Sequence, residues 1–545
     1  MIELLDTRPT TKLQLSDALQ PRHEFLYDLE WHVRGVGPRD NHARRWAWLG
    51  HAPSDFLQTL AGVGIAVDVY ANAKEVIAAS MQNGSAPDAL IMAYLDGANE
   101  DVIAAAHADT STFLNNFQEL LAEACLNQCS ILVLTRRAIA TQTIEDILDL
   151  GHAPLWGLVR AACVELPERT IMLGDIDDSD ASRGVLPKVL SLGEPQFALR
   201  DGLLRIPRFT RAKIMSESLP RGFSSSGTVL ITGGTGTLGA HVARHLVAKH
   251  GVRHVLLISR QGSTAPGASV LQHELEMSGA HVTIAAADVT DLESLKQLIA
   301  AIPDDHPLTG VIHAAGILDD GVLDTLTATR ISRVFRPKVD AAMHLHELTK
   351  DLQVPVFVLF SSLAGILGSA GQSNYAAANS FLDALAQHRR AHGLSAVSLA
   401  WGFWSEESNM SAHLTSADHA RRLRAGIGAL STAEGLALFD VALERPEANL
   451  APFRLLPANL QTMPIPPLLR EIVRIAPSRL ALADKKAPSP LDQRLRAIPE
   501  RDRERTLFDL LRAEIATVLG HSSPQSIDKD RSLRELGLDS LMALE

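Results

Sequence analysis

Mostly apolar runs of five to seven residues alternate with helical patterns along much of the chain. The first group of runs lies at 64–69, 89–94, 130–135 and 170–174, and between two of them apolar residues recur at helical spacing, at Phe113, Leu114, Phe117, Leu120 and Leu121. A second group lies at 228–232, 254–259, 281–287, 310–314, 356–360 and 396–400. Such alternation is typical of a parallel sheet with helices on both faces. The pattern predicts an α/β fold with two tandem subdomains.

The alternation ends near residue 463, where prolines become frequent. They mark a linker and stand at Pro464, Pro466, Pro467, Pro477, Pro488 and Pro490. An amphipathic helix follows, with an apolar face made by Leu507, Leu510, Leu511, Ile515, Val518 and Leu519. The chain stops at Glu545, inside what looks like a further helix, so we expect its ends to be cuts in a longer chain. The predicted parts are an N-terminal linker (1–21), two α/β subdomains (22–208 and 209–463), a Pro-rich linker (464–500) and an incomplete helical domain (501–545).

Composition narrows the classes of protein that the chain can belong to. The 545 residues carry 51 Lys+Arg against 63 Asp+Glu, and this net charge of −12 indicates no general affinity for nucleic acid or anionic membrane. No apolar run is long enough to span a bilayer, and the first residues lack the features of a signal peptide. Cys125, Cys129 and Cys163 are expected to be buried, reduced thiols of a cytoplasmic protein. No metal site is predicted, because no His or Cys pair near Cys125 and Cys129 completes a ligand set.

A glycine-rich turn follows the run at 228–232 and opens a helical pattern. Gly234, Gly236 and Gly239 have the G-x-G-x-x-G spacing, which allows a tight turn and close approach of the backbone to a pyrophosphate. The predicted cofactor-binding residues of this turn are Gly234, Thr235, Gly236, Thr237, Leu238 and Gly239. The turn makes the second subdomain a Rossmann-like, doubly wound dinucleotide-binding unit. The first subdomain has no such turn, so it is predicted to be structural and free of cofactor.

The residues after the next two runs indicate which dinucleotide binds. Ser259 and Arg260 stand where an NAD site has a carboxylate for the ribose 2′-hydroxyl. A guanidinium and a hydroxyl bind a 2′-phosphate instead, so the sequence predicts NADPH. Asp288 and Val289 are also predicted to bind the cofactor. Asp288 either accepts a hydrogen bond from the adenine amine or caps a helix.

Three polar residues follow the run at 356–360, at the edge where open α/β sheets bind ligands. They are Ser362, Tyr375 and Asn379, and the last two share a helix face. Reduction of a ketone needs a proton donor for the forming alkoxide and a second donor that polarises the carbonyl. A tyrosine with a lowered pKa can supply the proton and a serine hydroxyl can hold the oxygen, while a nearby lysine can lower the tyrosine pKa by its charge.

The pattern resembles the short-chain dehydrogenase/reductase superfamily. Most members have Lys four residues after the Tyr, whereas this chain has Asn379 there and Lys338 upstream. That exchange resembles the ketoreductase domains of modular type I polyketide synthases, as do the motifs at 313–316, 372–379 and 399–402, and, in the first subdomain, Glu30-Trp31 and 155–160. The resemblance implies NADPH-dependent reduction of a β-ketoacyl thioester held on an acyl carrier domain. It makes Tyr375 the acid, Ser362 the carbonyl donor, and Lys338 and Asn379 a supporting pair.

The same resemblance refines the expected product. Leu318, Asp319 and Asp320 match the Leu-Asp-Asp signature of B-type ketoreductases, which give a D-hydroxyl, although two adjacent carboxylates can also be an ordinary solvated loop. Leu367 replaces the tryptophan of A-type domains, and Ala370 is not the proline of the epimerising subtype. The short junction at 209–228 has no inserted enoylreductase, so a hydroxyl is expected, or an alkene if a dehydratase acts next. The segment 403–414 corresponds to an active-site lid.

The C-terminal motif at 536–542 resembles the phosphopantetheine site of an acyl carrier domain, with Ser540 as the attachment hydroxyl. A simple helix N-cap is the alternative. Because the domain is incomplete, Ser540 is expected to be a poor substrate for a phosphopantetheinyl transferase. The expected partners are the carrier and the other domains of a synthase module, namely a ketosynthase, an acyltransferase and possibly a dehydratase. The competing hypotheses are a stand-alone short-chain reductase of free ketones and a non-catalytic scaffold half-module.

Overall fold

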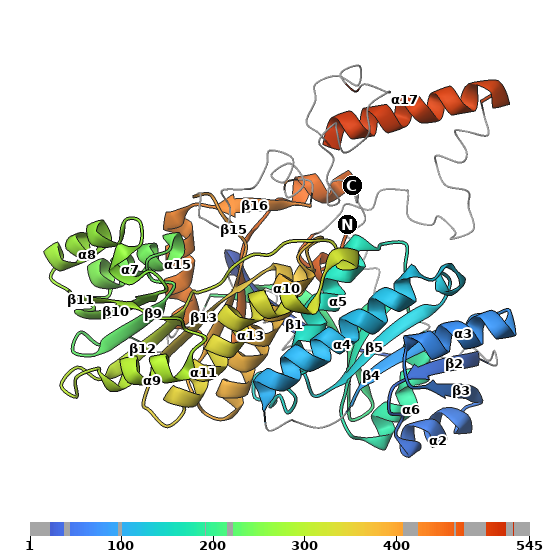
Figure 1. Ribbon diagram of the computed structural model, residues 1–545, viewed down its shortest axis with the longest axis horizontal. Helices are drawn as coiled ribbons and strands as arrows, with labels where there is room; N and C mark the ends of the chain where they lie inside the picture. The colour runs from blue at the N-terminus through green and yellow to red at the C-terminus, as the bar shows by residue number, and fades with distance from the viewer. Residues whose placement is uncertain are drawn as a thin grey trace, which may run out of the picture.

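A computed structural model describes residues 22–36, 44–95, 101–190, 192–214, 222–406, 423, 425–462, 465–473, 498–518 and 527 (Figure 1). Every apolar run predicted as a strand forms one. The predicted N-terminal linker 1–21, most of the lid segment and Ser540 lie outside the described residues.

The first subdomain, which we call the structural half, has a parallel sheet between two layers of helices. The order β3-β2-β4-β5-β6-β7 is parallel throughout. Its strands are β2 (Arg44–Leu49), β3 (Ile65–Tyr70), β4 (Ala89–Tyr94), β5 (Ser130–Arg136), β6 (Ile171–Ile176) and β7 (Gln196–Arg200). One face packs against α3 (Ala73–Asn83), α4 (Val102–Ala122) and α5 (Ala153–Glu165), and the other against α2 (Ser54–Gly62) and α6 (Asp180–Val189).

The second subdomain, the catalytic half, has the strand order β11-β10-β9-β12-β13-β14, which is the 3-2-1-4-5-6 order of dinucleotide-binding folds. Its strands are β9 (Thr228–Thr232), β10 (His254–Ser259), β11 (His281–Ala286), β12 (Leu308–His313), β13 (Val356–Ser362) and β14 (Val397–Trp401). Helices α7 (Thr237–Lys249), α8 (Ala268–Met277) and α15 (Thr432–Leu443) cover one face. The other face carries α9 (Leu292–Ala300), α10 (Ala328–Phe335), α11 (Ala341–Thr349) and α13 (Ser373–Ala391). The two-layered cover confirms the doubly wound prediction.

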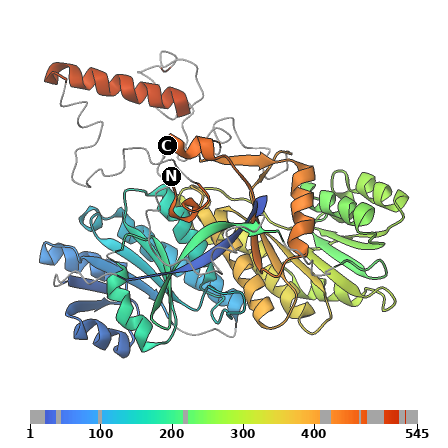
Figure 2. The same ribbon diagram turned by 180° about the vertical axis from the view of Figure 1, so that it is seen from behind.

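Three strands that the sequence analysis missed join the two halves into one sheet. They are β1 (Arg22–Arg34), β8 (Leu203–Lys213) and β17 (Asn449–Pro452). Figure 2 shows β1, in dark blue, running from the middle of the molecule across the structural half. β17 pairs with β14 in parallel and with β1 antiparallel, and β1 pairs antiparallel with β8, which completes a sheet of fifteen described strands. The expected boundary between residues 208 and 209 falls inside β8. The backbone hydrogen bonds of one sheet therefore run without a break from one half into the other.

Two smaller features complete the described fold. β15 (Phe403–Trp404), β16 (Ile427–Leu430) and β18 (Arg454–Leu455) form a separate small sheet. Part of the predicted Pro-rich linker, 465–473, packs on the fold, where Leu468 and Leu469 are buried beside Tyr27 and Phe209. The predicted amphipathic helix is α17 (Glu500–Val518).

The interface between the halves is formed by α5 and α13, which lie side by side at the centre of Figure 1. Their backbones touch, because a Cβ on Gly157 would lie 2.0 Å from the carbonyl oxygen of Ala376. One apolar cluster continues across this contact, from Phe113 and Trp156 in the structural half to Phe335 and Phe381 in the catalytic half. Because Gly157 has no side chain, α13 can lie in direct contact with α5.

The close contact predicts that Gly157→Ala is destabilising. The added methyl group meets backbone, which cannot rotate away, so we expect the free energy of unfolding to fall by about 3 kcal/mol. Gly184→Ala on α6 is the matched control, because its Cβ would meet nothing within 4 Å, and there the helix should gain about 0.5–1 kcal/mol. Urea unfolding of both variants followed by circular dichroism measures the difference. Equal midpoints would contradict the contact.

Candidate active site

The predicted catalytic side chains meet at the carboxyl end of β13. Ser362 is the last residue of that strand, Tyr375 lies in the first turn of α13, and Asn379 lies one turn further. The Tyr375 side chain lies near those of Ser362 and Asn379, and both influence its pKa. Ser362 Oγ also accepts the N–H of Ala364 at 3.3 Å, which fixes its position at the strand end. The fold thus brings together residues that the sequence separates by a loop.

Lys338 reaches the same place from a π-helical turn (Arg336–Asp340) between α10 and α11. Its Nζ donates to the carbonyl oxygen of Phe360 at 2.9 Å and to Asn379 Oδ1 at 2.8 Å. The Asn379 amide in turn donates to the backbone oxygen of Tyr375 at 2.7 Å. Lys338 Nζ lies 5.2 Å from the centre of the Tyr375 ring. Asn379 therefore connects the lysine to the tyrosine helix.

The pKa of Tyr375 differs from the value expected from the sequence. Burial raises the pKa of Tyr375, hydrogen bonds with Asn379 and Ser362 oppose the rise, and the charge of Asp320 adds to it. Burial also lowers the pKa of Lys338 to about 7, against the attraction of Asp383. The prediction of a tyrosine pKa lowered by lysine is not met, because burial, the largest effect, raises the pKa of Tyr375. A raised pKa keeps the tyrosine hydroxyl protonated, as a proton donor requires.

The glycine-rich turn lies between β9 and α7, at the point where the strand order reverses. Gly233 has a φ of +66°, and a Cβ there would lie 3.0 Å from Ala314 O. A Cβ on Gly239 would lie 2.4 Å from Gly233 O, so neither position accepts a side chain. Gly236 is the N-cap of α7 and offers no capping side chain, which leaves the first amides of the helix for an anion. This turn fits the pyrophosphate of a dinucleotide.

The residues predicted to choose between dinucleotides lie beside the turn. Ser259 ends β10, and its Oγ accepts the N–H of Gly262 at 3.0 Å. Arg260 is exposed, and no hydrogen bond or ion pair within the described part of the chain engages its guanidinium. Asp288 is not a helix N-cap, since Asp291 caps α9, and Asp288 instead accepts the N–H of Thr290 at 3.0 Å. Val289 beside it is buried.

The loop at 318–320 lies against the start of α13. Arg330 Nε donates to Asp319 Oδ1 at 3.1 Å. The side-chain amide of Gln372 donates to Asp320 Oδ2 at 2.9 Å, and that of Asn374 donates to the backbone oxygen of Asp319 at 3.0 Å. The two carboxylates are therefore held within the site and are not a freely solvated pair.

Three protein-family models match the chain. The model described as "KR domain" matches residues 227–406, and "Polyketide synthase extender module SpnB, Rossmann fold domain" matches 29–209. "Phosphopantetheine attachment site" matches 509–545. The chain is also similar to a solved structure titled "Structure of A-type Ketoreductases from Modular Polyketide Synthase", with 32% identity and a TM-score of 0.72, over 82% of this chain and 98% of that one.

The chain belongs to the ketoreductases of modular polyketide synthases. A second solved relative, "The first ketoreductase of the tylosin PKS", has 30% identity and a TM-score of 0.69 over 83% of this ketoreductase and 99% of that chain. The Spectinabilin polyketide synthase system protein NorA' of Streptomyces orinoci is 42% identical over the whole of this chain, which spans 15% of that protein. The ketoreductase is thus a β-ketoacyl reductase with a nicotinamide cofactor, and its C-terminal part matches a carrier.

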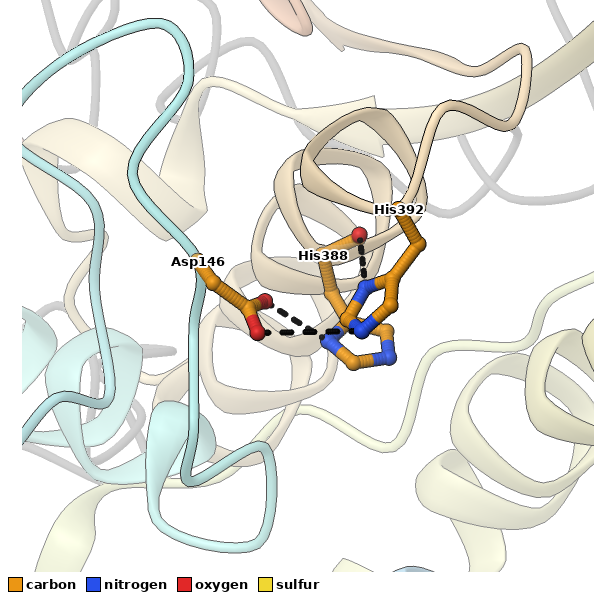
Figure 3. Close-up of side chains that lie close together, drawn as sticks. All are labelled: Asp146, His388 and His392. Atoms are coloured by element: carbon orange, nitrogen blue, oxygen red, sulfur yellow. Dashed lines mark hydrogen bonds and ion pairs between the residues drawn. The ribbon is translucent and has the colours of Figure 1, made fainter.

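Within the part of the chain that the structure describes, two clusters of side chains could hold a metal ion, and the sequence analysis predicted neither. In one, drawn in Figure 3, His388 Nδ1 and His392 Nε2 lie 3.1 and 3.7 Å from the two carboxylate oxygens of Asp146. Asp146 belongs to the structural half, whereas His388 lies on α13 and His392 is the C-cap of that helix, so these contacts also join the halves. The second cluster contains His245, His250 and Asp440. Each joins segments far apart in sequence, which no spacing motif reveals.

The remaining expectations concern cysteines and membranes. Cys129 is buried and Cys163 half-buried, and burial raises the pKa of each thiol to about 12. The prediction that Cys125 is buried is wrong, because it lies exposed on the short helical turn Ala124–Leu126. Among the described residues, no helix is both long enough and apolar enough to cross a bilayer.

The free guanidinium beside the cofactor turn gives a prediction about cofactor choice. In Arg260→Asp, attraction for a 2′-phosphate becomes repulsion, so we expect NADPH to bind about 10- to 100-fold more weakly and NADH to change about twofold or less. Arg253→Asp is the control, because it makes the same charge change at the other end of β10. Fluorescence titration of both cofactors measures the effect. An equal loss for NADPH and NADH would mean that Arg260 does not contact the phosphate.

Proposed function

We propose that the chain reduces the β-ketone of an acyl thioester, carried on an acyl carrier domain, to a D-configured β-hydroxyl with NADPH and without epimerising the α-carbon. The observation that carries this proposal is the grouping of Lys338, Asn379, Tyr375 and Ser362 at the carboxyl end of β13. In it Lys338 Nζ donates to Asn379 Oδ1, and the Asn379 amide donates to the backbone oxygen of Tyr375.

In this proposal Tyr375 is the general acid. Its hydroxyl gives a proton to the carbonyl oxygen, whose carbon accepts a hydride, and a C–H and an O–H bond replace the carbon–oxygen π bond. The bound nicotinamide supplies the hydride. The Ser362 hydroxyl holds the carbonyl oxygen while negative charge develops on it. Lys338 and Asn379 act as positioning residues, because Lys338 holds the Asn379 side chain and the Asn379 amide in turn donates to the backbone of Tyr375.

The choice of NADPH is supported by Arg260 at the end of β10, where a carboxylate would favour NADH. The B-type assignment is supported by the 318–320 loop. That loop is tied to Gln372 and Asn374 directly before Tyr375, so it lies where it can bias how the substrate enters. Similarity to solved A-type ketoreductases does not decide the type, because the overall fold is shared.

The proposed partner is a carrier domain bearing the acyl chain, and the match to a phosphopantetheine attachment site supports it. Ser540 would carry the prosthetic group, and a ketosynthase, an acyltransferase and possibly a dehydratase would act in the same module. A stand-alone reductase would turn over small free ketones at least as well as thioesters. A scaffold would bind no NADPH. Turnover of a diketide N-acetylcysteamine thioester beside a small ketone, with an NADPH titration, separates the three.

Loss of the proposed acid gives the first test. Tyr375→Phe removes the hydroxyl and keeps the ring, so we expect turnover to fall roughly 10²–10⁴-fold while NADPH binding stays nearly intact. Tyr70→Phe is the control, since it makes the same change on β3 of the structural half, and it should leave turnover unchanged. Single-turnover absorbance at the NADPH band follows both. A Tyr375→Phe enzyme within a few-fold of wild type would refute the assignment.

Product configuration gives the second test. A B-type ketoreductase gives the D-hydroxyl, which is (3R) in a simple acyl chain, and leaves an α-methyl group in its original configuration. Chiral chromatography of the product from a 2-methyl-3-oxo thioester of defined α-configuration, against all four synthetic standards, reads both centres. A predominantly L-hydroxy product would contradict the role given to Leu318, Asp319 and Asp320.

A further inference from the structure

One buried carboxylate of the structural half reaches the surroundings of Tyr375. Glu165 is the last residue of α5 and is 5% exposed. Its Oε2 accepts the N–H of Leu323 at 2.8 Å, and its Oε1 accepts the N–H of Gly371 at 2.8 Å and the hydroxyl of Ser373 at 3.4 Å. All three donors belong to the catalytic half.

The two segments that Glu165 holds are those that shape the active site. One runs from the 318–320 loop into the short helical turn Leu323–Thr325, and the other, 368–373, leads directly into the turn of α13 that carries Tyr375. The segments are also bonded to each other, since the N–H of Gly321 donates to Gly371 O at 2.7 Å. Glu165 thus spans the junction between the proposed stereocontrol loop and the proposed acid.

We propose that Glu165 is a positioning residue for the reduction, and that it fixes Tyr375 and the 318–320 loop relative to each other. The inference rests on the proposed function, which assigns roles to both. A carboxylate suits the task because its two oxygens accept from amides of two different segments, and a buried amide without an acceptor is unfavourable. The structural half is predicted to bind no cofactor, yet through Glu165 it supplies a part of the catalytic geometry.

The alternative is that Glu165 only holds the two halves together. Asp146 offers a direct comparison, because it is another carboxylate of the structural half that bonds to α13 (Figure 3). Its partners, His388 and His392, lie at the far end of that helix from Tyr375. General cohesion predicts similar effects for both carboxylates, whereas positioning predicts an effect for Glu165 alone.

The test compares Glu165→Gln with Asp146→Asn in the full chain. Gln keeps the volume but presents one oxygen and one NH₂, so one of the two amides loses its acceptor. We expect kcat of Glu165→Gln to fall about 10- to 100-fold and the fraction of minor stereoisomer to rise, with the NADPH dissociation constant within about twofold of wild type. Asp146→Asn should leave all three unchanged. If Glu165→Gln does not fold, Glu165→Asp, which keeps the charge and shortens the reach, replaces it.

Hydrogen exchange of peptides 318–325 and 368–375 gives a readout independent of turnover. Their amides should exchange faster in Glu165→Gln and not in Asp146→Asn. Turnover of the thioester by the wild type tests the proposed function, and a wild type without turnover would refute that function. The hydrogen-exchange comparison would still show whether Glu165 holds the two segments. Unchanged rate and product ratio in Glu165→Gln, unchanged exchange, or equal losses in Asp146→Asn would each overturn the inference.

Discussion

The direct backbone contact between α5 and α13 is the constraint on which the rest of the molecule depends. Gly157 allows the two helices to meet without an intervening side chain, and this fixes where the N-terminal turn of α13 lies. From the same helix, Arg160 donates to Gly365 O at 2.8 Å on α12 (Ala364–Leu367), close to Ser362. One helix of the structural half therefore supports the elements on both sides of the proposed active site.

The exchanged positions of lysine and asparagine have a simple structural basis. Lys338 lies on the π-helical turn, and its Nζ donates to two oxygens, Phe360 O near the end of β13 and Asn379 Oδ1 on α13. A lysine at 379 would share a helix face with Tyr375. Here Lys338 comes from another element instead, and the side chain of Asn379 connects it to the backbone of Tyr375. Gly316 makes room for it, because a Cβ there would lie 2.9 Å from Lys338 Cε.

Much of the fold could be read from the sequence, because buried parallel strands are continuous apolar runs and the cofactor turn is contiguous. The candidate catalytic residues could also be predicted, since Tyr375 and Asn379 share one helix and Lys338 followed from resemblance to a family. The joining strands were missed for a physical reason. β17 pairs with β1 across more than 400 residues, at Leu26 and Pro452, and no local pattern specifies such a partner. Glu165 was missed likewise, because its donors lie more than 150 residues away.

The uninterrupted sheet has a consequence for recombining synthases. A chimera that exchanged only the catalytic half would have to rebuild the pairing of β14, β17, β1 and β8 from strands of two parents. It would also have to match the helix contact at Gly157 and the carboxylate at Glu165. The natural unit of exchange therefore begins before β1 and ends after the packed stretch at 465–473, and crossovers between the halves should be the least tolerated ones.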